Sequence, residues 1–366
     1  MIEISEPNWR PLLERLADEL TPEPLAEPAW DRAFRQVPRH VFVPGFYADQ
    51  EEGEPVWIDT EDERWLPGVY SDDALTTQLR QHPQAPGLWW PTSSSSRPSL
   101  MLAMLHSLTV GEGDRVLELG TGSGYNAALL CARLSEDQVV TVDIDPELTR
   151  TAGERLTRAG FRPEIATADG TGGVPGRQLF ERVIATHSVE RVPHAWVART
   201  RPGGIILADI RSVGAPRIGH LARLVVGEDG IAEGGFDVGE PGYFMPTRLE
   251  VETPQRRFPA PMDLRDAVER RSAIGPKDVA DDGAMMGLWA AVPEIGVSRM
   301  GERLLLFTPD GSWARADGDG EIDAAGPRDL WAAAEHAHEQ WVAAGRPGIA
   351  DYRVRVGPWG QDISVP

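Results

Sequence analysis

The spacing of apolar residues divides the first part of the chain into helical and irregular stretches. Apolar side chains recur at helical intervals in residues 9–20 and again from Trp30 to Phe34, with prolines between the two stretches. Residues 49–92 lack this spacing, because an acidic run is followed by a run rich in Trp, Pro and Gln. We expect two helices and then an irregular, partly hairpin-like lid segment.

From about residue 98, short apolar runs typical of buried strands alternate with longer stretches typical of helices. Strands are expected at residues 115–120, 139–144, 163–169, 182–187 and 204–210. Helices are expected at residues 99–108, 123–134 and 146–160, and between the last two strands. This alternation predicts parallel βαβ units in a doubly wound α/β sheet.

The alternation stops at about residue 212. Further strands are expected at residues 221–226, 248–253, 303–317 and 352–356, and a helix at 327–345 that Gly345 ends. Asp310 and Gly311 predict a hairpin turn inside the third of these strands. We expect three parts: residues 1–92 as a helical and lid segment, 93–212 as a ligand-binding core, and 213–366 as a smaller α+β region.

The charge balance argues against polyanionic partners. The 366 residues include 57 acidic and 36 basic side chains, a formal charge of -21 that repels nucleic acid and anionic membranes. Cys131 is the single cysteine, so no intrachain disulfide is possible. Residues 1–20 lack the features of a signal peptide, and no apolar run approaches the ~18 residues of a membrane span. We expect a soluble, cytoplasmic protein.

The strongest motif is Glu-Leu-Gly-Thr-Gly-Ser-Gly-Tyr at residues 118–125, between a predicted strand and a predicted helix. Gly120, Gly122 and Gly124 allow the backbone to turn sharply and a ligand to approach it. The ligand would face the unpaired N–H groups at the start of the helix.

A turn of this kind also fits a nicotinamide nucleotide, but three features favour S-adenosylmethionine (SAM). The spacing is GxGxG, and Glu118 stands where a carboxylate can meet the methionyl ammonium group. The next strand ends in Asp143, an acid placed to accept hydrogen bonds from a ribose diol. Asp169 and Gly170 follow the third strand, near the expected adenine. The alternative, glycines that only form tight turns, leaves the three acids unexplained.

The predicted cofactor-binding residues lie in or beside these turns: Glu118, Gly120, Thr121, Gly122, Ser123, Gly124, Asp143, Ile144, Asp169 and Gly170. We expect Asp145 to cap the helix that begins at Pro146 rather than to bind a ligand. No histidines stand at ligand spacing, so no metal site is expected.

Residues 30–212 resemble the protein-L-isoaspartate O-methyltransferases. The resemblance lies in Val-Pro-Arg-His-Val-Phe-Val-Pro at 37–44, in residues 113–128 around the glycine turn, in 168–170 and in Arg-Pro-Gly-Gly at 201–204. It implies a Rossmann-like SAM-dependent methyltransferase with an N-terminal helical and lid segment and a C-terminal α+β extension. It also implies a peptide or protein substrate that carries Asp or isoaspartate.

The sequence departs from the family pattern at two places. Where the family has Gly-Gln-Thr-Ile-Ser-Gln-Pro, residues 92–98 read Thr-Ser-Ser-Ser-Ser-Arg-Pro, which places the family's active-site serine on Ser96 and its threonine on Ser94. The second departure that the resemblance implies is one of size. Isoaspartate repair enzymes lack a long C-terminal region, which this chain has at residues 213–366. Both features resemble the homologues associated with ribosomally made peptides (graspetides and lanthipeptides), which methylate an aspartate in a precursor peptide, after which the ester closes to an aspartimide.

A carboxylate is already ionised at neutral pH, so methyl transfer needs alignment rather than a strong base. We expect the hydroxyls of Ser96 and Ser94, with Ser95 as a further candidate, to hold it in line with the methyl group. The alternative for residues 93–96 is a flexible polar linker. Arg97 is a candidate for neutralising the carboxylate, although a solvent-facing or lid-pairing role is favoured.

Three more residues are candidates for contact with substrate. Thr186 and His187 follow the fourth strand, where a histidine is about as often structural. Trp90 precedes the serines and forms either a wall of the substrate channel or part of the core. Isoaspartyl repair and a non-catalytic SAM- or peptide-binding module are the alternatives to peptide tailoring.

Overall fold

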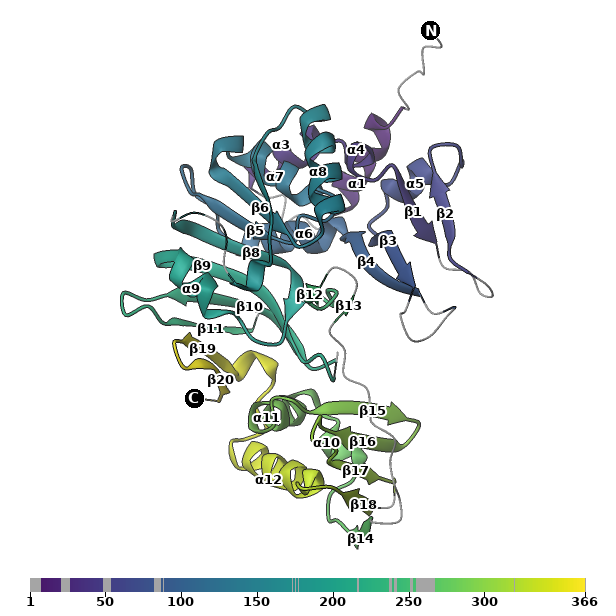
Figure 1. The fold of residues 1–366 in the computed structure, drawn as a ribbon, viewed down its shortest axis with the longest axis vertical. Helices are drawn as coiled ribbons and strands as arrows, with labels where there is room; N and C mark the ends of the chain where they lie inside the picture. The colour runs from purple at the N-terminus through teal and green to yellow at the C-terminus, as the bar shows by residue number, and fades with distance from the viewer. Residues whose placement is uncertain are drawn as a thin grey trace. The chain divides into compact units, whose positions relative to one another are not determined.

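The computed structural model describes residues 8–20, 27–48, 54–81, 87, 89–172, 174, 176, 178–215, 217–236, 239, 242–250, 253–254, 267–318 and 320–365. Figure 1 follows the chain from purple at the N-terminus to yellow at the C-terminus. Contacts divide it into two compact units. The first comprises Met1–Thr186, Arg199–Leu207 and Arg248–Pro254, and the second comprises His187–Ala198, Ala208–Thr247 and Gln255–Pro366.

The first unit begins with the two predicted helices. They are α1 (Arg10–Glu19) and α3 (Pro28–Gln36), and both bury the apolar face that the spacing indicated. The short helix α4 (Arg39–Phe42) follows at once. Helix α3 packs against α7 and α4 against α8, so the N-terminal segment lies on the core of its own unit.

The described residues between 45 and 95 form more regular structure than expected. They form an antiparallel sheet in the order β2 (Val56–Asp59), β1 (Gly45–Ala48), β3 (Leu75–Gln81) and β4 (Trp89–Ser95), with α5 (Trp65–Val69) between β2 and β3. The β3–β4 pair confirms the hairpin-like part of the prediction. Residues 49–53, 82–86 and 88 lie outside the described part.

The core of the first unit has the predicted alternation. Strands β5 (Val116–Leu119), β6 (Val139–Asp143), β7 (Glu164–Thr167) and β8 (Phe180–Val189) pair in parallel in the order β8-β5-β6-β7. Helices α6 (Pro98–Ser107), α7 (Tyr125–Arg133) and α8 (Pro146–Arg158) and the turns η1 (Glu136–Gln138) and η2 (Gly170–Gly172) connect them. Strands β5 and β6 are buried throughout, as their apolar runs predicted. The fold is Rossmann-like.

Strand β9 (Thr200–Arg211) pairs with β8 and belongs to the first unit at its start and to the second at its end. Helix α9 (His194–Arg199) precedes it in the chain. Beyond β9 the sheet continues in the order β10 (Gly219–Val226), β11 (Ala232–Phe236), β19 (Arg353–Gly357) and β20 (Gly360–Ser364). The pairs from β10 to β20 are antiparallel.

The second unit also contains an α+β part. Its antiparallel sheet has the order β14 (Val268–Arg271), β18 (Glu321–Ala325), β17 (Trp313–Ala316), β16 (Arg303–Phe307) and β15 (Gly296–Met300). Helices α10 (Pro276–Val279), α11 (Asp282–Ala291) and α12 (Leu330–Ala343) and the turn η4 (Ile349–Asp351) complete it. The β16–β17 hairpin turns at Gly311, whose φ of +87° confirms the predicted turn.

The observed division differs from the expected boundaries at residues 92 and 212. Residues 187–198 belong to the second unit, and the short pair β12 (Arg248–Glu250) and β13 (Thr253–Pro254) belongs to the first. The cause is pairing at the sheet: residues after 212 supply strands that satisfy the backbone groups at the edge of β9. Residues 251–252 of the strand expected at 248–253 lie outside the described part.

Candidate functional site

The predicted glycine turn leads from β5 into α7. Gly120, Gly122 and Gly124 have φ angles of +102°, +52° and +88°, which residues with a side chain rarely adopt. A Cβ at Gly124 would lie 3.1 Å from that of Ala152 on α8. The turn therefore requires glycine for its conformation and, at Gly124, also for close packing.

Glu118 is fully buried beneath this turn. Its Oε1 accepts a hydrogen bond from Asn126 Nδ2 at 2.7 Å, and its Oε2 accepts one from Thr141 Oγ1 at 2.6 Å. Burial raises the pKa of Glu118 to about 7, with a further increase from the charge of Asp143, although the two hydrogen bonds oppose the shift. These bonds tie β5 to β6 and α7. Each oxygen can accept a further bond, and the contact with an ammonium group stays a prediction.

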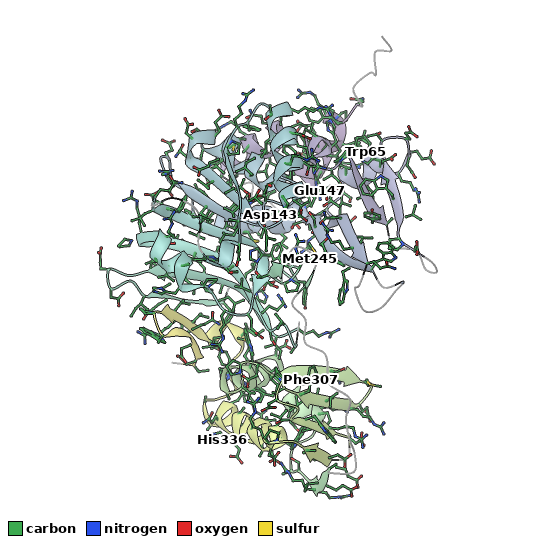
Figure 2. The ribbon with its side chains drawn as sticks, in the orientation of Figure 1. Trp65, Asp143, Glu147, Met245, Phe307 and His336 are labelled. Atoms are coloured by element: carbon green, nitrogen blue, oxygen red, sulfur yellow. The ribbon has the colours of Figure 1, made fainter. Side chains whose placement is uncertain are left out.

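Asp143 ends β6 and supports the turn directly. Its Oδ2 accepts a hydrogen bond from the N–H of Gly122 at 2.9 Å, and its Oδ1 accepts one from the N–H of Asp145 at 3.1 Å. Asp145 accepts from the N–H of Glu147 at 3.0 Å, which confirms it as the cap of α8. Figure 2 labels Asp143 and Glu147, which precede and follow the cap in sequence. Ile144 lies between the two acids and is half-buried.

The remaining predicted cofactor residues lie at the same edge of the sheet, because parallel strands bring their carboxyl ends together. Thr121 Oγ1 lies 2.7 Å from Thr141 Oγ1, and Ser123 is buried in the turn. Asp169 accepts hydrogen bonds from the N–H and the hydroxyl of Thr171 at 2.9 and 2.6 Å. A Cβ at Gly170 would lie 2.8 Å from Leu119 Cδ2, so a side chain there would require Leu119 to shift.

Three of the four serines form the end of strand β4 rather than a flexible linker, and this end meets the glycine turn. A Cβ at Gly122 would lie 3.6 Å from Ser93 Oγ and 3.7 Å from the carbonyl oxygen of Ser94. Ser93 and Ser95 are buried, whereas Ser94 and Ser96 are half-buried. The structure thus brings the two predicted groups of residues, glycines and serines, to one place.

Ser95 differs from the role predicted for it. Its hydroxyl is buried and accepts a hydrogen bond from Arg39 Nε at 3.3 Å. Successive residues of a strand point to opposite faces, so Ser95 shares its face with Ser93. Ser94 points to the opposite face and Ser96 follows the end of β4, and substrate contact by these two serines stays a prediction.

Arg39 is a residue of this site that the sequence prediction missed. Its guanidinium is fully buried and donates to the carbonyl oxygens of Ser95 and Ser96 at 3.2 and 3.1 Å. It also donates to three carbonyl oxygens of the loop before β3, those of Val69, Ser71 and Asp73 at 2.9 to 3.0 Å. Burial lowers the pKa of Arg39 to about 10. The one signal in the sequence that could have revealed Arg39 was the position of a charged residue within the mostly apolar run at 37–44.

The other candidates have structural surroundings. Thr186 donates its hydroxyl to the carbonyl oxygen of Gly120 at 2.7 Å and so supports the glycine turn. His187 Nδ1 lies 2.6 Å from Thr247 Oγ1. Trp90 is buried in β4, which favours the core interpretation, and Arg97 is half-buried at the start of α6.

The described residues contain neither a metal cluster nor a membrane helix. No group of three or more His, Cys, Asp or Glu side chains in that part of the chain is arranged to hold a metal ion. No helix among the same residues is long and apolar enough to cross a membrane.

The family model for protein-L-isoaspartate(D-aspartate) O-methyltransferases matches residues 15–223, which is more than half of the chain and includes the glycine turn, Asp143 and the serine strand. The chain belongs to this family. Its family resemblance and its Rossmann-like fold are thereby confirmed.

Individual O-methyltransferases of the family agree with this assignment. Proteins named protein-L-isoaspartate O-methyltransferase from Bradyrhizobium sp. (strain ORS 278) and Methanoculleus marisnigri are 39% and 30% identical over 180 and 194 residues, which are 49% and 53% of this chain and 69% and 72% of the relatives. The Azorhizobium caulinodans protein of that name is 39% identical over 139 residues, 38% of this chain. The chain spans 62%, 56% and 54% of the relatives from A. caulinodans, Ignicoccus hospitalis and Thermococcus onnurineus.

A solved structure named protein-L-isoaspartate O-methyltransferase shares the fold beyond the family-matched residues. It covers 98% of this chain and 99% of its own, with a TM-score of 0.57 and 19% identity. This likeness concerns the fold alone, and the expectation that isoaspartate repair enzymes lack the long C-terminal region stays a prediction.

Proposed function

We propose that this chain transfers a methyl group from SAM to an aspartyl-type side-chain carboxylate in a peptide or protein. The observation that carries the proposal is the approach of the serine strand to the glycine turn, where a Cβ on Gly122 would come within 3.6 Å of Ser93 and 3.7 Å of Ser94. A cofactor on the turn and a carboxylate on the strand would therefore be neighbours. Reactants held in this way react far faster than free ones.

The residues at the turn fit SAM. Gly120 and Gly122 have no side chain to block close approach to the backbone. Asp143 ends β6 and Asp169 follows β7, and their carboxylate oxygens can accept from ribose and adenine. SAM, when bound there, supplies an electrophilic methyl group on a sulfonium. Glu118 would act from beneath, by fixing the turn and by adding negative charge near a cationic cofactor.

The serines fit a carboxylate acceptor. A carboxylate has a reference pKa near ~3.9 and is ionised at neutral pH, so the protein has to align it and remove water from it. Hydroxyls of Ser94 and Ser96 can donate to it without adding charge, and Arg97 lies next in sequence. Arg39 holds the carbonyl oxygens of Ser95 and Ser96, and so fixes the strand from behind.

We propose isoaspartyl residues as the first substrate to test, because the relatives above carry that name. Aspartate in a ribosomally made precursor peptide is the second candidate, favoured by the serines that replace the family's usual residues at 92–96. In either product, attack by the next amide nitrogen on the methyl ester closes a five-membered imide and releases methanol. Residues 213–366 are proposed to aid substrate recognition.

The test is methyl transfer from labelled SAM to an isoaspartyl peptide, to the same peptide with Asp, and to a precursor peptide encoded nearby, if there is one. Ser96→Ala is expected to reduce kcat by about tenfold to a hundredfold, as loss of a positioning hydrogen bond does, with an unchanged Kd for S-adenosylhomocysteine. The exposed Ser135→Ala is the matched control and should behave as the wild type. Tight cofactor binding without transfer to any peptide would contradict the proposal and favour a binding module.

A further inference from the structure

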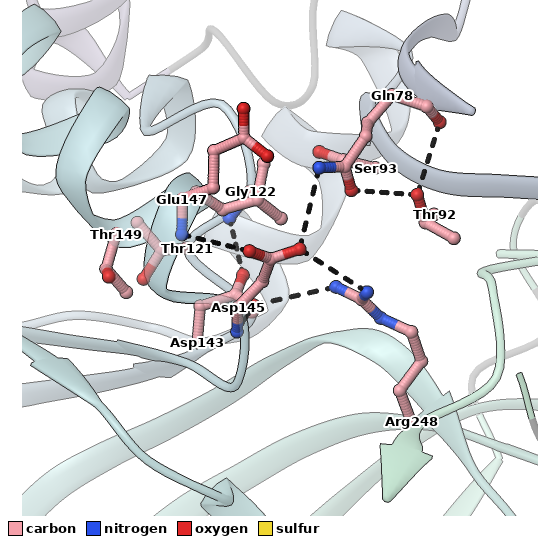
Figure 3. A network of polar contacts seen from close by, with 12 residues as sticks. Gln78, Thr92, Ser93, Thr121, Gly122, Asp143, Asp145, Glu147, Thr149 and Arg248 are labelled. Carbon is pink, nitrogen blue, oxygen red and sulfur yellow. Dashed lines mark hydrogen bonds and ion pairs between the residues drawn. The ribbon is translucent and has the colours of Figure 1, made fainter. Parts of the chain in front are cut away.

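A residue beyond the family-matched part of the chain reaches the proposed cofactor site. Arg248 begins β12, which lies in the first unit, and the family model ends at residue 223. Its Nη2 lies 3.8 Å from Asp143 Oδ1, and its Nη1 lies 3.6 Å from Asp145 Oδ2 (Figure 3). The side chains of Arg248, Asp143 and Asp145 are 10%, 8% and 1% exposed, so this contact is shielded from solvent.

The two acids differ in how many partners they have. Asp145 accepts from the N–H of Glu147 and also contacts Gln78 Nε2 at 3.5 Å and Arg80 Nη2 at 3.3 Å, so it keeps a cation without Arg248. Among the contacts of Asp143 within the described residues, two come from backbone N–H groups and Arg248 supplies the third. Asp143 therefore depends on Arg248 for its nearby positive charge, whereas Asp145 does not.

The Arg248 contact and a ribose contact at the same oxygen exclude each other. A hydroxyl placed between two groups and hydrogen-bonded to both needs them about 5 Å apart, since each bond spans about 2.7 to 3.0 Å. The gap between Arg248 Nη2 and Asp143 Oδ1 is 3.8 Å. A ribose hydroxyl therefore cannot bridge the two groups. Because Oδ1 already accepts from the N–H of Asp145, the hydroxyl and the guanidinium would compete for its remaining lone pair.

We propose that Arg248 sets the affinity of the site for its cofactor by competing with the ribose for Asp143. This rests on the proposed function. When the cofactor binds, Arg248 gives up Asp143 and keeps Asp145, which lies within reach of its other nitrogen.

The test compares the Kd of S-adenosylhomocysteine for full-length variants by isothermal titration calorimetry. Arg248→Gln is expected to bind about threefold to tenfold more tightly than the wild type, the range expected for a shielded ion pair of this length. Arg248→Met keeps the apolar part of the side chain and should tighten binding by the same factor. It serves as the second variant in case glutamine perturbs strand β12. Thermal unfolding of each variant verifies that it is folded.

Two control variants separate competition at Asp143 from general effects of charge. Arg80→Gln removes a cation that contacts Asp145 but, within the described part of the chain, not Asp143, and it should change the Kd less than about twofold. Arg270→Gln breaks an ion pair of the second unit, in which Arg270 donates to Glu335 at 2.9 and 2.8 Å, and should leave the Kd unchanged.

The outcomes distinguish this inference from the function on which it rests. If the wild type fails to bind S-adenosylhomocysteine, the proposed function fails. If the wild type binds and both Arg248 variants bind equally well or more weakly, the competition is refuted while the proposed function stands. Tighter binding by Arg80→Gln as well would also overturn it, because charge alone would then explain the gain.

Discussion

Replacing Glu118 by Gln changes the charge under the glycine turn with almost no change in shape. Glu118 is fully buried, and burial raises its pKa from the ordinary 4.5 to about 7. A glutamine at this position would keep an oxygen that can accept from Asn126, and its amide can donate to Thr141, whose hydroxyl also lies next to that of Thr121. The substitution therefore removes the ionisation and leaves the hydrogen bonds largely in place.

The magnitude follows from linkage between protonation and folding. Because the pKa is higher in the folded state, the native protein holds more protons than the unfolded chain between about pH 4.5 and pH 7. The contribution of Glu118 to stability is therefore lost as the pH rises through this window and stays lost above it. The free energy of unfolding of the wild type therefore falls by about 2 to 3 kcal/mol between about pH 5 and pH 8. Glu118→Gln has no ionisable group at this position and does not show this loss.

The assay is urea unfolding of the wild type and Glu118→Gln at a series of pH values, with the difference in the free energy of unfolding taken at each pH. Other ionisable groups largely cancel in this difference. We expect it to move in favour of Glu118→Gln by about 2 to 3 kcal/mol between pH 5 and pH 8. A difference that does not vary with pH, or that moves in favour of the wild type, would refute the claim of a buried carboxyl with a raised pKa.

Two further substitutions test the supports of the site. Arg39→Gln should lower the free energy of unfolding by about 3 to 5 kcal/mol in urea and reduce kcat, because the buried carbonyl oxygens of Ser95 and Ser96 lose their donor; a loss below about 1 kcal/mol would contradict this. Gly122→Ala should weaken S-adenosylhomocysteine binding about tenfold by calorimetry, because its Cβ enters the space facing the serine strand. Gly230→Ala, at φ +72° with open space around it, has similar backbone strain and should leave binding unchanged; equal weakening in both would point to strain alone.

The glycine turn, its acids and the βαβ core could be predicted because local sequence determines them. The positive φ angles at Gly120 and Gly122 require glycine. The apolar run of β5 ends at the turn and that of β6 ends at Asp143, so the runs locate both features in the sequence. The serine strand could be located by its motif. Its side-chain directions could not, because they depend on pairing with β3, which turns Ser95 toward Arg39.

Contacts between segments that lie far apart in the chain could not be predicted from the sequence. Arg39 joins residues 69–73 to residues 95–96, and Arg248 stands more than a hundred positions from Asp143. Neither pair has a spacing that reveals it. Of the strands after residue 212, those at 221–226, 303–317 and 352–356 were predicted, whereas β11, β14, β15, β18 and β20 were not. An apolar run does not say which neighbour it will pair with, so the continuation of β9 into a second unit was missed.

The central claim is that the glycine turn and the serine strand form one site for methyl transfer. A crystal structure of the protein with S-adenosylhomocysteine tests it most directly. We expect the ligand beside Gly122, its ribose on Asp143, and its sulfur facing Ser94 and Ser96. A ligand bound elsewhere, or bound at the turn with its sulfur directed away from the serine strand, would contradict the claim.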